Sequence, residues 1–170
     1  LDHCMEFAMN AQSETWADKL GLGGLQESDE ELVSDLLVLL GSTEVDMTMF
    51  FRGLCSATEP DVDHLSAALY EGDEPSKTAW NAWLTRWWER VDGQPDRDTM
   101  RTANPKYVLR NWMAQLAIDA AEQNNDFTVA EELHELLKRP YDEQPEHEER
   151  WFQKRPEWAR HRVGLSLIHI

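Results

Sequence analysis

The sequence has few basic residues and few cysteines. Its 170 residues include 16 Lys and Arg against 33 Asp and Glu, which leaves a formal charge of −17 with histidine neutral. Such a negative field repels phosphate backbones and anionic lipid headgroups, so we expect proteins or cations as partners, with no nucleic acid and no membrane among them. Only Cys4 and Cys55 are present, outside any Cys-x-x-Cys pair, which excludes a disulfide framework and is typical of a reducing compartment.

Long apolar runs and a recognisable start are also missing. No apolar run reaches the ~20 residues that a transmembrane helix needs, so we expect a soluble, cytoplasmic protein. The first ten residues lack an initiator Met at position 1 and the basic-then-apolar order of a secretory signal, and we therefore expect a piece of a longer protein. At 41% hydrophobic residues the chain is too apolar for disorder and has the length of one ordinary domain.

The apolar residues repeat with a helical period of about 3.6, and no clean period-2 alternation is found, which predicts an all-α fold. Ser28 with Glu31 predicts a capping box, and apolar residues on several faces predict that the helix after it is buried on two sides. Asn104 and Pro105 predict the start of another helix, by an N-cap and a first-turn proline. The predicted helices cover residues 5–20, 28–41, 48–54, 58–69, 76–91, 105–124 and 127–138.

Four of the eight tryptophans fall within nine residues of one predicted helix, at positions 80, 83, 87 and 88. Their spacing of three, four, seven and eight residues forms one stripe. Such a stripe could stack on bases or a ligand, but the surrounding charge is wrong for nucleic acid. We therefore interpret it as a packing face.

The sequence offers no pattern for an active site. The pair His134-Glu135 lacks the second histidine of a zinc motif, and His64 and His134 are expected to be partly exposed. The Gly21-x-Gly23 pair has Gln26 where a dinucleotide loop needs its third glycine, and no Gly-x-Ser-x-Gly motif occurs. We therefore predict that this chain contributes no catalytic, cofactor-binding or metal-binding residue.

One block of the sequence matches a known family pattern. It is the run Asn104-Pro105-Lys106-Tyr107-Val108-Leu109-Arg110-Asn111-Trp112-Met113-Ala114-Gln115-Leu116-Ala117-Ile118. This run closely resembles the signature Asn-Pro-x-x-Val-Leu-Arg-Asn-x-x-Ala-Gln-x-Ala-Ile near the C-terminus of the selenoprotein O (YdiU) family. Further matches keep the family's order: Lys19-Leu20-Gly21-Leu22, Asp46-x-Thr48-x-x-Phe51-Arg52-x-Leu54, Asp119-Ala120-Ala121-Glu122, Asp126-Phe127, Arg139-Pro140-Tyr141-Asp142-Glu143-Gln144-Pro145 and Arg155-Pro156-Glu157-Trp158-Ala159.

The resemblance spans nearly the whole chain and implies a protein-kinase-like fold of the pseudokinase type. It implies an enzyme that transfers AMP from ATP to Ser, Thr or Tyr hydroxyls of other proteins, assisted by Mg²⁺ or Mn²⁺. The family's ATP-cradling and metal-binding residues precede this region, so the resemblance places none of them here. The expected partners are the missing N-terminal kinase-like part of the same protein and the protein substrates of the whole enzyme.

The resemblance also implies how the chain is divided. Residues 1–139 are expected to form the helical C-terminal region of the kinase-like domain, and residues 140–163, with Pro140, Pro145 and Pro156, an extended strap. Family members commonly end in a serine-rich tail with cysteine or selenocysteine. Residues 164–170 are apolar instead, so we interpret them as an atypical tail from a junction artefact, which puts redox regulation in doubt here.

Two alternatives stay open at this point. The chain could be a freestanding helical interaction module, because residues 106–138 resemble a tetratricopeptide pair, although no repeat of ~34 residues is found elsewhere. Arg110 lies on an otherwise apolar predicted helix and is expected to be a structural charge partner, with direct contact to ATP or a protein substrate as the alternative.

Overall fold

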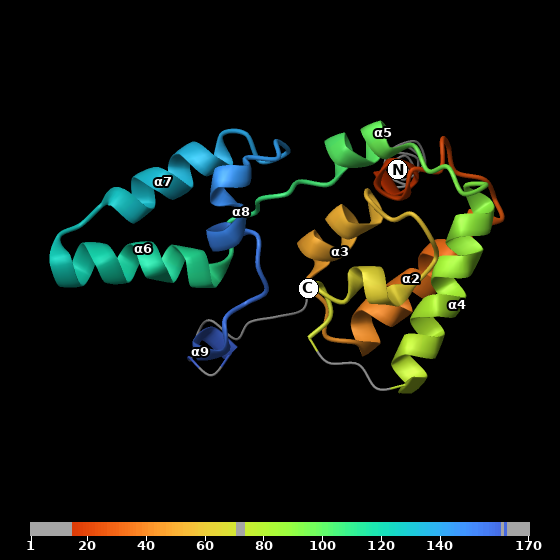
Figure 1. The fold of residues 1–170 in the computed structure, drawn as a ribbon, viewed down its shortest axis with the longest axis horizontal. Coiled ribbons are helices and arrows are strands. Elements are labelled where there is room, and N and C mark those ends of the chain that lie inside the picture. Colours follow the sequence, from red (N-terminus) through yellow and green to blue (C-terminus); the bar gives the residue numbers. More distant parts are fainter. Residues whose placement is uncertain (1–14, 71–73, 161, 163–170) are drawn as a thin grey trace, which may run out of the picture. The chain divides into compact units, whose positions relative to one another are not determined.

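The computed structural model describes residues 15–70, 74–160 and 162, and the chain forms two compact units. Unit 1 is Leu1–Asn104 and unit 2 is Pro105–Ile170, so the division falls inside the region that the sequence analysis treats as one helical body. The elements of unit 1 are α2 (Asp29–Ser42), α3 (Met47–Leu54), the 3-10 helix η1 (Val62–Leu65), α4 (Glu74–Arg90) and α5 (Arg97–Ala103). Those of unit 2 are α6 (Asn111–Asn124), α7 (Thr128–Leu137), α8 (Pro145–Trp151) and α9 (Glu157–Arg160) (Figure 1).

The predicted all-α fold is confirmed. The described part of the chain is helical apart from its connections and one isolated antiparallel bridge between Val45 and Leu69. Of the predicted helix over 5–20, residues 15–20 are helical and residues 5–14 lie outside the described residues, as do residues 71–73 and the tail 164–170. No helix in the described residues is long and apolar enough to cross a membrane.

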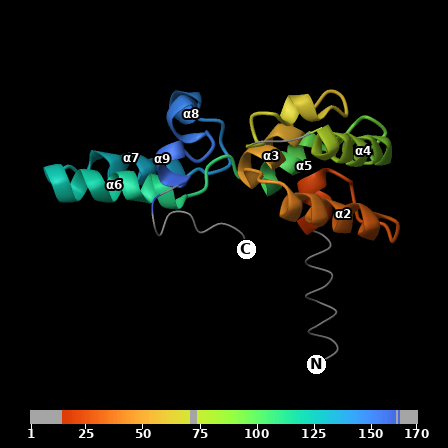
Figure 2. The same cartoon turned by 90° about the horizontal axis from the view of Figure 1, so that it is seen from below.

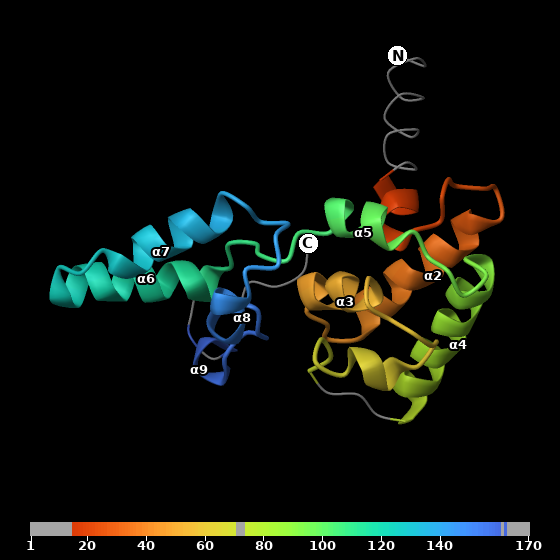
Figure 3. The same ribbon diagram turned by 45° about the horizontal axis from the view of Figure 1, so that its top comes forward.

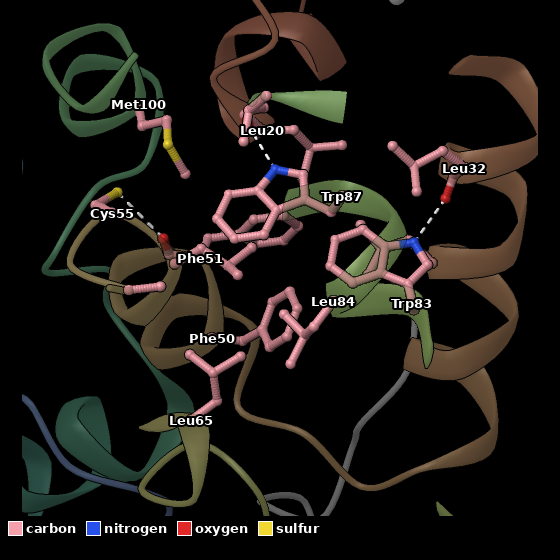
Figure 4. Packing of buried hydrophobic residues seen from close by; sticks show 14 of the residues in the cluster. Leu20, Leu32, Phe50, Phe51, Cys55, Leu65, Trp83, Leu84, Trp87 and Met100 are labelled. Atoms are coloured by element: carbon pink, nitrogen blue, oxygen red, sulfur yellow. Dashed lines mark hydrogen bonds between the residues drawn. The ribbon is translucent and has the colours of Figure 1, made fainter. Parts of the chain in front are cut away.

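The tryptophan stripe of α4 packs into the core of unit 1, as predicted (Figure 4). Trp88 is only partly buried against that core. Trp83 and Trp87 are buried, and their rings are stacked with centroids 6.3 Å apart. The indole nitrogen of Trp83 donates to the carbonyl oxygen of Leu32 at 2.8 Å, and that of Trp87 to the carbonyl oxygen of Leu20 at 2.9 Å. These bonds let the rings pack among apolar side chains without leaving those two donors unsatisfied.

The helix before α2 ends at Gly21, as the sequence predicts. Gly21 adopts the left-handed region with φ +65°, and a Cβ atom there would lie 2.7 Å from the sulfur of Met100 and 2.9 Å from the backbone nitrogen of Asp96. Gly23 has nearly the same φ, but its Cβ position is open. Position 21 therefore requires glycine for both conformation and close packing.

Two predictions for α2 are wrong. Ser28 makes no side-chain cap hydrogen bond, because it takes up helical backbone angles at the start of the helix. Only one face of α2 is buried: Leu32, Val33 and Leu36 lie in the core, whereas Leu37 and Val38 are 49% and 66% exposed. The sequence thus places apolar residues on more of the α2 surface than unit 1 buries.

Other elements differ in length from the predictions. Residues 48–54 and 76–91 are helical within one or two residues of the predicted bounds. The predicted helix over 58–69 is reduced to the single turn η1, where the Asp61 side chain accepts a hydrogen bond from the backbone of Asp63. Helix α5 was not predicted, and it begins where the Asp96 side chain accepts from the Thr99 backbone nitrogen.

Unit 2 is built on the predicted antiparallel pair α6 and α7, which run side by side (Figure 2). Its small core includes Trp112 on α6, Leu133 and Leu136 on α7, and Trp151 on α8, with the Trp112 and Trp151 rings 5.9 Å apart. Asn125 ends α6 in the left-handed conformation, as a helix C-terminus commonly requires. The segment predicted as an extended strap instead contains the short helices α8 and α9, because Pro145 occupies the first turn of α8, where it is tolerated.

Candidate functional site

Unit 1 buries a set of polar groups around Asn104, the first residue of the signature block. Asn104 is 1% exposed. Its side-chain nitrogen donates to the carbonyl oxygen of Lys19 at 2.9 Å, and its side-chain oxygen accepts from Lys19 Nζ at 3.2 Å. Its backbone nitrogen donates to the carbonyl oxygen of Met100, and Asn104 thereby caps the C-terminus of α5. Asn104 therefore links the end of α5 to Lys19, which lies two residues before Gly21.

Asn104 and Pro105 do not start a helix, so that prediction is wrong. Helix α6 begins only at Asn111. The backbone nitrogens of Lys106 and Tyr107 both donate to the carbonyl oxygen of Pro140, at 2.8 and 3.0 Å. These are the amides that an Asn104 N-cap would bind, but Pro140 accepts from them and the Asn104 side chain binds Lys19 instead.

Arg52 supports the same end of α5 from within unit 1. Its guanidinium Nη1 donates to the carbonyl oxygens of Arg101 and Asn104, at 3.1 and 3.0 Å, and the residue is only 7% exposed. A positive charge beside the last carbonyls of a helix satisfies them and complements the helix dipole. Arg52 thus acts as a structural cation.

The buried thiol of Cys55 lies against this group. Its sulfur donates to the carbonyl oxygen of Phe51 at 3.2 Å. Burial raises the pKa of Cys55, although the nearby charge of Arg52 and a hydrogen bond from Asn104 oppose the rise. Because the thiolate is the reactive form, Cys55 is held as an unreactive thiol.

Unit 2 buries a lysine at the start of the signature block. The Lys106 side chain is 5% exposed, and its Nζ lies 2.9 Å from Glu143 and 2.8 Å from Glu148. Its ammonium also lies 5.2 Å from the ring centroid of Phe152. Lys106 therefore ties the segment before α6 to the segment that leads into α8.

Two neighbouring residues complete this connection. The Tyr107 hydroxyl lies 2.9 Å from the carbonyl oxygen of Glu143 and 3.0 Å from that of Gln144. Gln144 has a left-handed backbone, and its side-chain nitrogen donates to the carbonyl oxygens of Leu136 and Arg139 at the end of α7. Burial raises the pKa of Tyr107, which keeps the phenol neutral.

Glu132 on α7 holds α8 from another side. It accepts hydrogen bonds from the Trp151 indole nitrogen, at 2.7 Å, and from Arg150. His147 lies 3.4 Å from the same carboxylate. The Glu132 carboxylate thus joins α7 to α8 through partners within unit 2.

Several individual residues were considered in the sequence analysis. His64 and His134 are exposed, as predicted, and His64 pairs with Glu59 at 2.8 Å. Arg110 is half-buried at the N-cap of α6, where its guanidinium donates to the carbonyl oxygen of Gln153. In the described ranges no three His, Cys, Asp or Glu side chains gather as metal ligands would. That this chain holds no catalytic or binding residue stays a prediction.

Lys106→Met is expected to flatten the response of the protein's stability to alkaline pH. Burial alone would lower the pKa of Lys106, but the hydrogen bonds with Glu148 and Glu143 outweigh it, so the pKa is raised. A raised pKa means that the stabilisation is complete below the ordinary lysine value of about 10.4 and is lost as the pH rises through the folded-state value. The variant should lose about 1 kcal/mol near neutral pH, because the two glutamates remain partly solvated.

Urea unfolding over a pH series from neutral to alkaline would measure this effect. The matched control is Lys138→Met, which removes the same charge from a side chain that is 52% exposed and paired with Glu135. The free energy of unfolding of the control should change with pH in parallel with that of the parent protein. Parallel slopes for Lys106→Met and the parent would contradict the assignment.

Comparisons with known proteins agree with the resemblance of the signature block. Residues 3–138 match the family described as Protein adenylyltransferase SelO. The chain is 42% identical over 168 residues to a protein nucleotidyltransferase YdiU of Flavobacterium johnsoniae, with 91% of this chain and 32% of the relative covered. It is 45% identical over 176 residues to the protein of that name from Rhodopirellula baltica, with 89% of this chain and 32% of the relative covered. The chain therefore spans about a third of the length of these relatives.

Proposed function

The chain belongs to the SelO protein adenylyltransferase family, and we propose that it is the C-terminal part of an enzyme that transfers AMP from ATP to Ser, Thr or Tyr hydroxyls of other proteins. The observation that carries the proposal is the family match, which runs from residue 3 to residue 138 and so extends through unit 1 into unit 2. The printed name of the relatives, protein nucleotidyltransferase, supports the same class of reaction.

In the proposed reaction, a hydroxyl oxygen of the protein substrate attacks the α-phosphorus of ATP. The bond from that phosphorus to the bridging oxygen breaks, pyrophosphate leaves, and the hydroxyl proton passes to a base. Mg²⁺ or Mn²⁺, bound by the kinase-like part of the full-length protein, would supply positive charge that offsets the charge of the phosphates. ATP and the metal belong to the kinase-like part of the full-length protein, which we place in the cytoplasm.

The role that we propose for this segment is structural. Asn104, Arg52 and Lys106 are buried polar groups that bind carbonyl, ammonium and carboxylate groups of the same unit. Groups that are satisfied in this way stabilise a scaffold, whereas a site that works on substrate presents donors to the ligand. The segment would then brace the part of the enzyme that binds ATP.

The experiment is a transfer assay with labelled ATP and candidate protein substrates in the presence of Mg²⁺ or Mn²⁺. The isolated chain should transfer no label, and a full-length chimaera, in which this chain replaces the matching third of the Flavobacterium johnsoniae relative, should label protein. Labelling by the isolated chain would overturn the structural role. A chimaera that is folded and binds ATP but labels no protein would overturn the proposed activity.

The second candidate function, a freestanding helical interaction module, is favoured by the antiparallel α6 and α7 pair. A module that works alone should unfold cooperatively as a monomer and bind little hydrophobic dye. Strong dye binding by the isolated chain would instead indicate apolar surface that the full-length protein covers.

A further inference from the structure

The outer part of the α6 and α7 hairpin contains no buried residue. From Ala114 to Glu132 every residue is at least partly exposed, although the stretch is rich in apolar side chains. Leu116, Ala117 and Val129 are only partly covered, by packing against the small core of unit 2. Ile118 and Phe127 are 47% and 55% exposed.

Two short helices with so little burial are marginal by themselves. α6 has 14 residues and α7 has 10, which is close to or below the length at which an isolated helix becomes stable in water. Within unit 2, α8 lies beside the end of the hairpin where α6 begins, and the turn between α6 and α7 is at the opposite end (Figure 3). The turn half of the hairpin therefore needs a further surface to bury its apolar residues.

The charge of the hairpin restricts what that surface can be. Residues 111–137 contain six Asp and Glu and no Lys or Arg. Arg162 neutralises Asp119, and Arg150 neutralises Glu132, but Glu122 and Glu131 are exposed. An occupant that covers this surface must offset the negative charge, so it carries basic residues beside apolar ones.

Unit 1 is too acidic to be this occupant. Residues 1–104 contain 21 Asp and Glu against 7 Lys and Arg, a net charge of −14. Its cations are also engaged within the unit: Arg52 and Arg97 bind backbone carbonyls, and Arg90 pairs with Asp29. Unit 1 therefore does not supply the basic occupant. Within unit 2, Arg150 and Arg162 are already engaged with Glu132 and Asp119, so they do not serve the rest of the hairpin surface.

We propose that the hairpin surface formed by residues 114–132 docks onto a basic, partly apolar surface in the remaining two thirds of the full-length protein. This inference rests on the proposed function and names the docking surface through which the brace would act. A hairpin that is only marginally stable when uncovered needs a permanent occupant. An occupant in the same polypeptide chain is present at high effective concentration. The relatives are about three times as long as the part of them that this chain matches, which leaves room for such an occupant.

Hydrogen exchange read by mass spectrometry tests the proposal on the isolated chain and on the full-length chimaera described above. In the chimaera, exchange of the amides in 114–132 should be slower by at least about tenfold, because docking suppresses local opening. Amides of α4, which lies in the core of unit 1, should change far less. Equal exchange of 114–132 in the two proteins would overturn the proposal.

Substitutions in the chimaera locate the surface. Ile118→Glu and Phe127→Glu should each abolish most of the added protection, since a further carboxylate would meet a buried contact. The matched control is Val38→Glu on α2, which makes the same kind of change at a side chain that is 66% exposed in unit 1. An equal effect of the control and the hairpin variants would contradict the assignment to the hairpin.

The remaining outcomes also decide between occupants. If the isolated chain protects 114–132 by dimerising, sedimentation velocity will show a concentration-dependent dimer that Phe127→Glu abolishes, and the tethered occupant is wrong. The readout is independent of AMP transfer. Protection without transfer would retain the docking surface and reject the activity, whereas transfer without protection would do the reverse.

Discussion

Trp87→Ala is expected to lower the free energy of unfolding of unit 1 by about 3–5 kcal/mol, because it opens a large cavity in a core that cannot collapse around it. Trp87 is fully buried, and its ring stacks on Trp83. The substitution also removes the donor that satisfies the carbonyl oxygen of Leu20, which lies at the end of the helix before Gly21. Loss of that bond should loosen the first described helix as well as the core.

The measurement is urea unfolding followed by far-ultraviolet circular dichroism, because tryptophan fluorescence would change with the substitution itself. Trp88→Ala is the matched control: it removes the same side chain from the next position of α4, where the ring is only partly buried. The control should cost about 1 kcal/mol, in keeping with a partly solvated side chain. Equal losses at positions 87 and 88 would show that the deeper burial of Trp87 does not set its contribution to stability.

The packing of α4 could be predicted from the sequence because it depends on local spacing alone. Indoles at three and four residues apart lie on one face whatever the partner is, and a face of that size needs burial. The end of the first described helix at Gly21 could also be predicted, because it depends on the local backbone conformation of a glycine. The spacing could not supply the hydrogen-bond partners of the Trp83 and Trp87 indole nitrogens, since Leu32 and Leu20 lie on other elements.

The beginnings of two helices were mispredicted for different reasons. Ser28 has helical backbone angles and makes no side-chain cap hydrogen bond, so its pairing with Glu31 does not form the capping box. At Asn104 the competition is long-range: its side chain binds Lys19, and Pro140 accepts from the amides of Lys106 and Tyr107 that an Asn104 cap would bind. Long-range partners can thus override local capping chemistry when they bind the same groups.

The buried cations could not be predicted from the sequence. Lys106 has its two carboxylate partners at positions 143 and 148, and Arg52 binds carbonyls at positions 101 and 104. Nothing in the local pattern distinguishes these residues from solvated ones, because a charged side chain is usually exposed. The family signature includes several of these positions, but it does not state their contacts.

Two ion pairs that join α2 to α4 allow a direct comparison of burial. Asp29 and Arg90 form a bidentate pair at 2.7 and 2.9 Å, with side chains 2% and 21% exposed. Asp35 and Arg86 join the same helices at 2.6 Å, but their side chains are 43% and 44% exposed. Both pairs have hydrogen-bond geometry, so a difference between their coupling energies measures the effect of burying the ion pair away from water.

Arg90→Met is expected to destabilise unit 1 by about 3–5 kcal/mol, because it leaves the buried Asp29 carboxylate without a counter-charge. Asp29→Ala should cost less, since Arg90 is closer to solvent and keeps its bond to the carbonyl oxygen of Gly24. The double variant should be more stable than the sum of the two losses predicts, with a coupling energy of about 1–3 kcal/mol. Urea unfolding of all four proteins gives this cycle.

The control cycle uses Asp35→Ala and Arg86→Met, for which the coupling should be below about 1 kcal/mol and should shrink with added salt. The coupling of Asp29 with Arg90 should respond little to salt, since the carboxylate is screened from solvent by the protein. Equal couplings in the two cycles would show that burial does not strengthen the inner pair. A larger coupling at the inner pair would identify it as the main electrostatic link between α2 and α4.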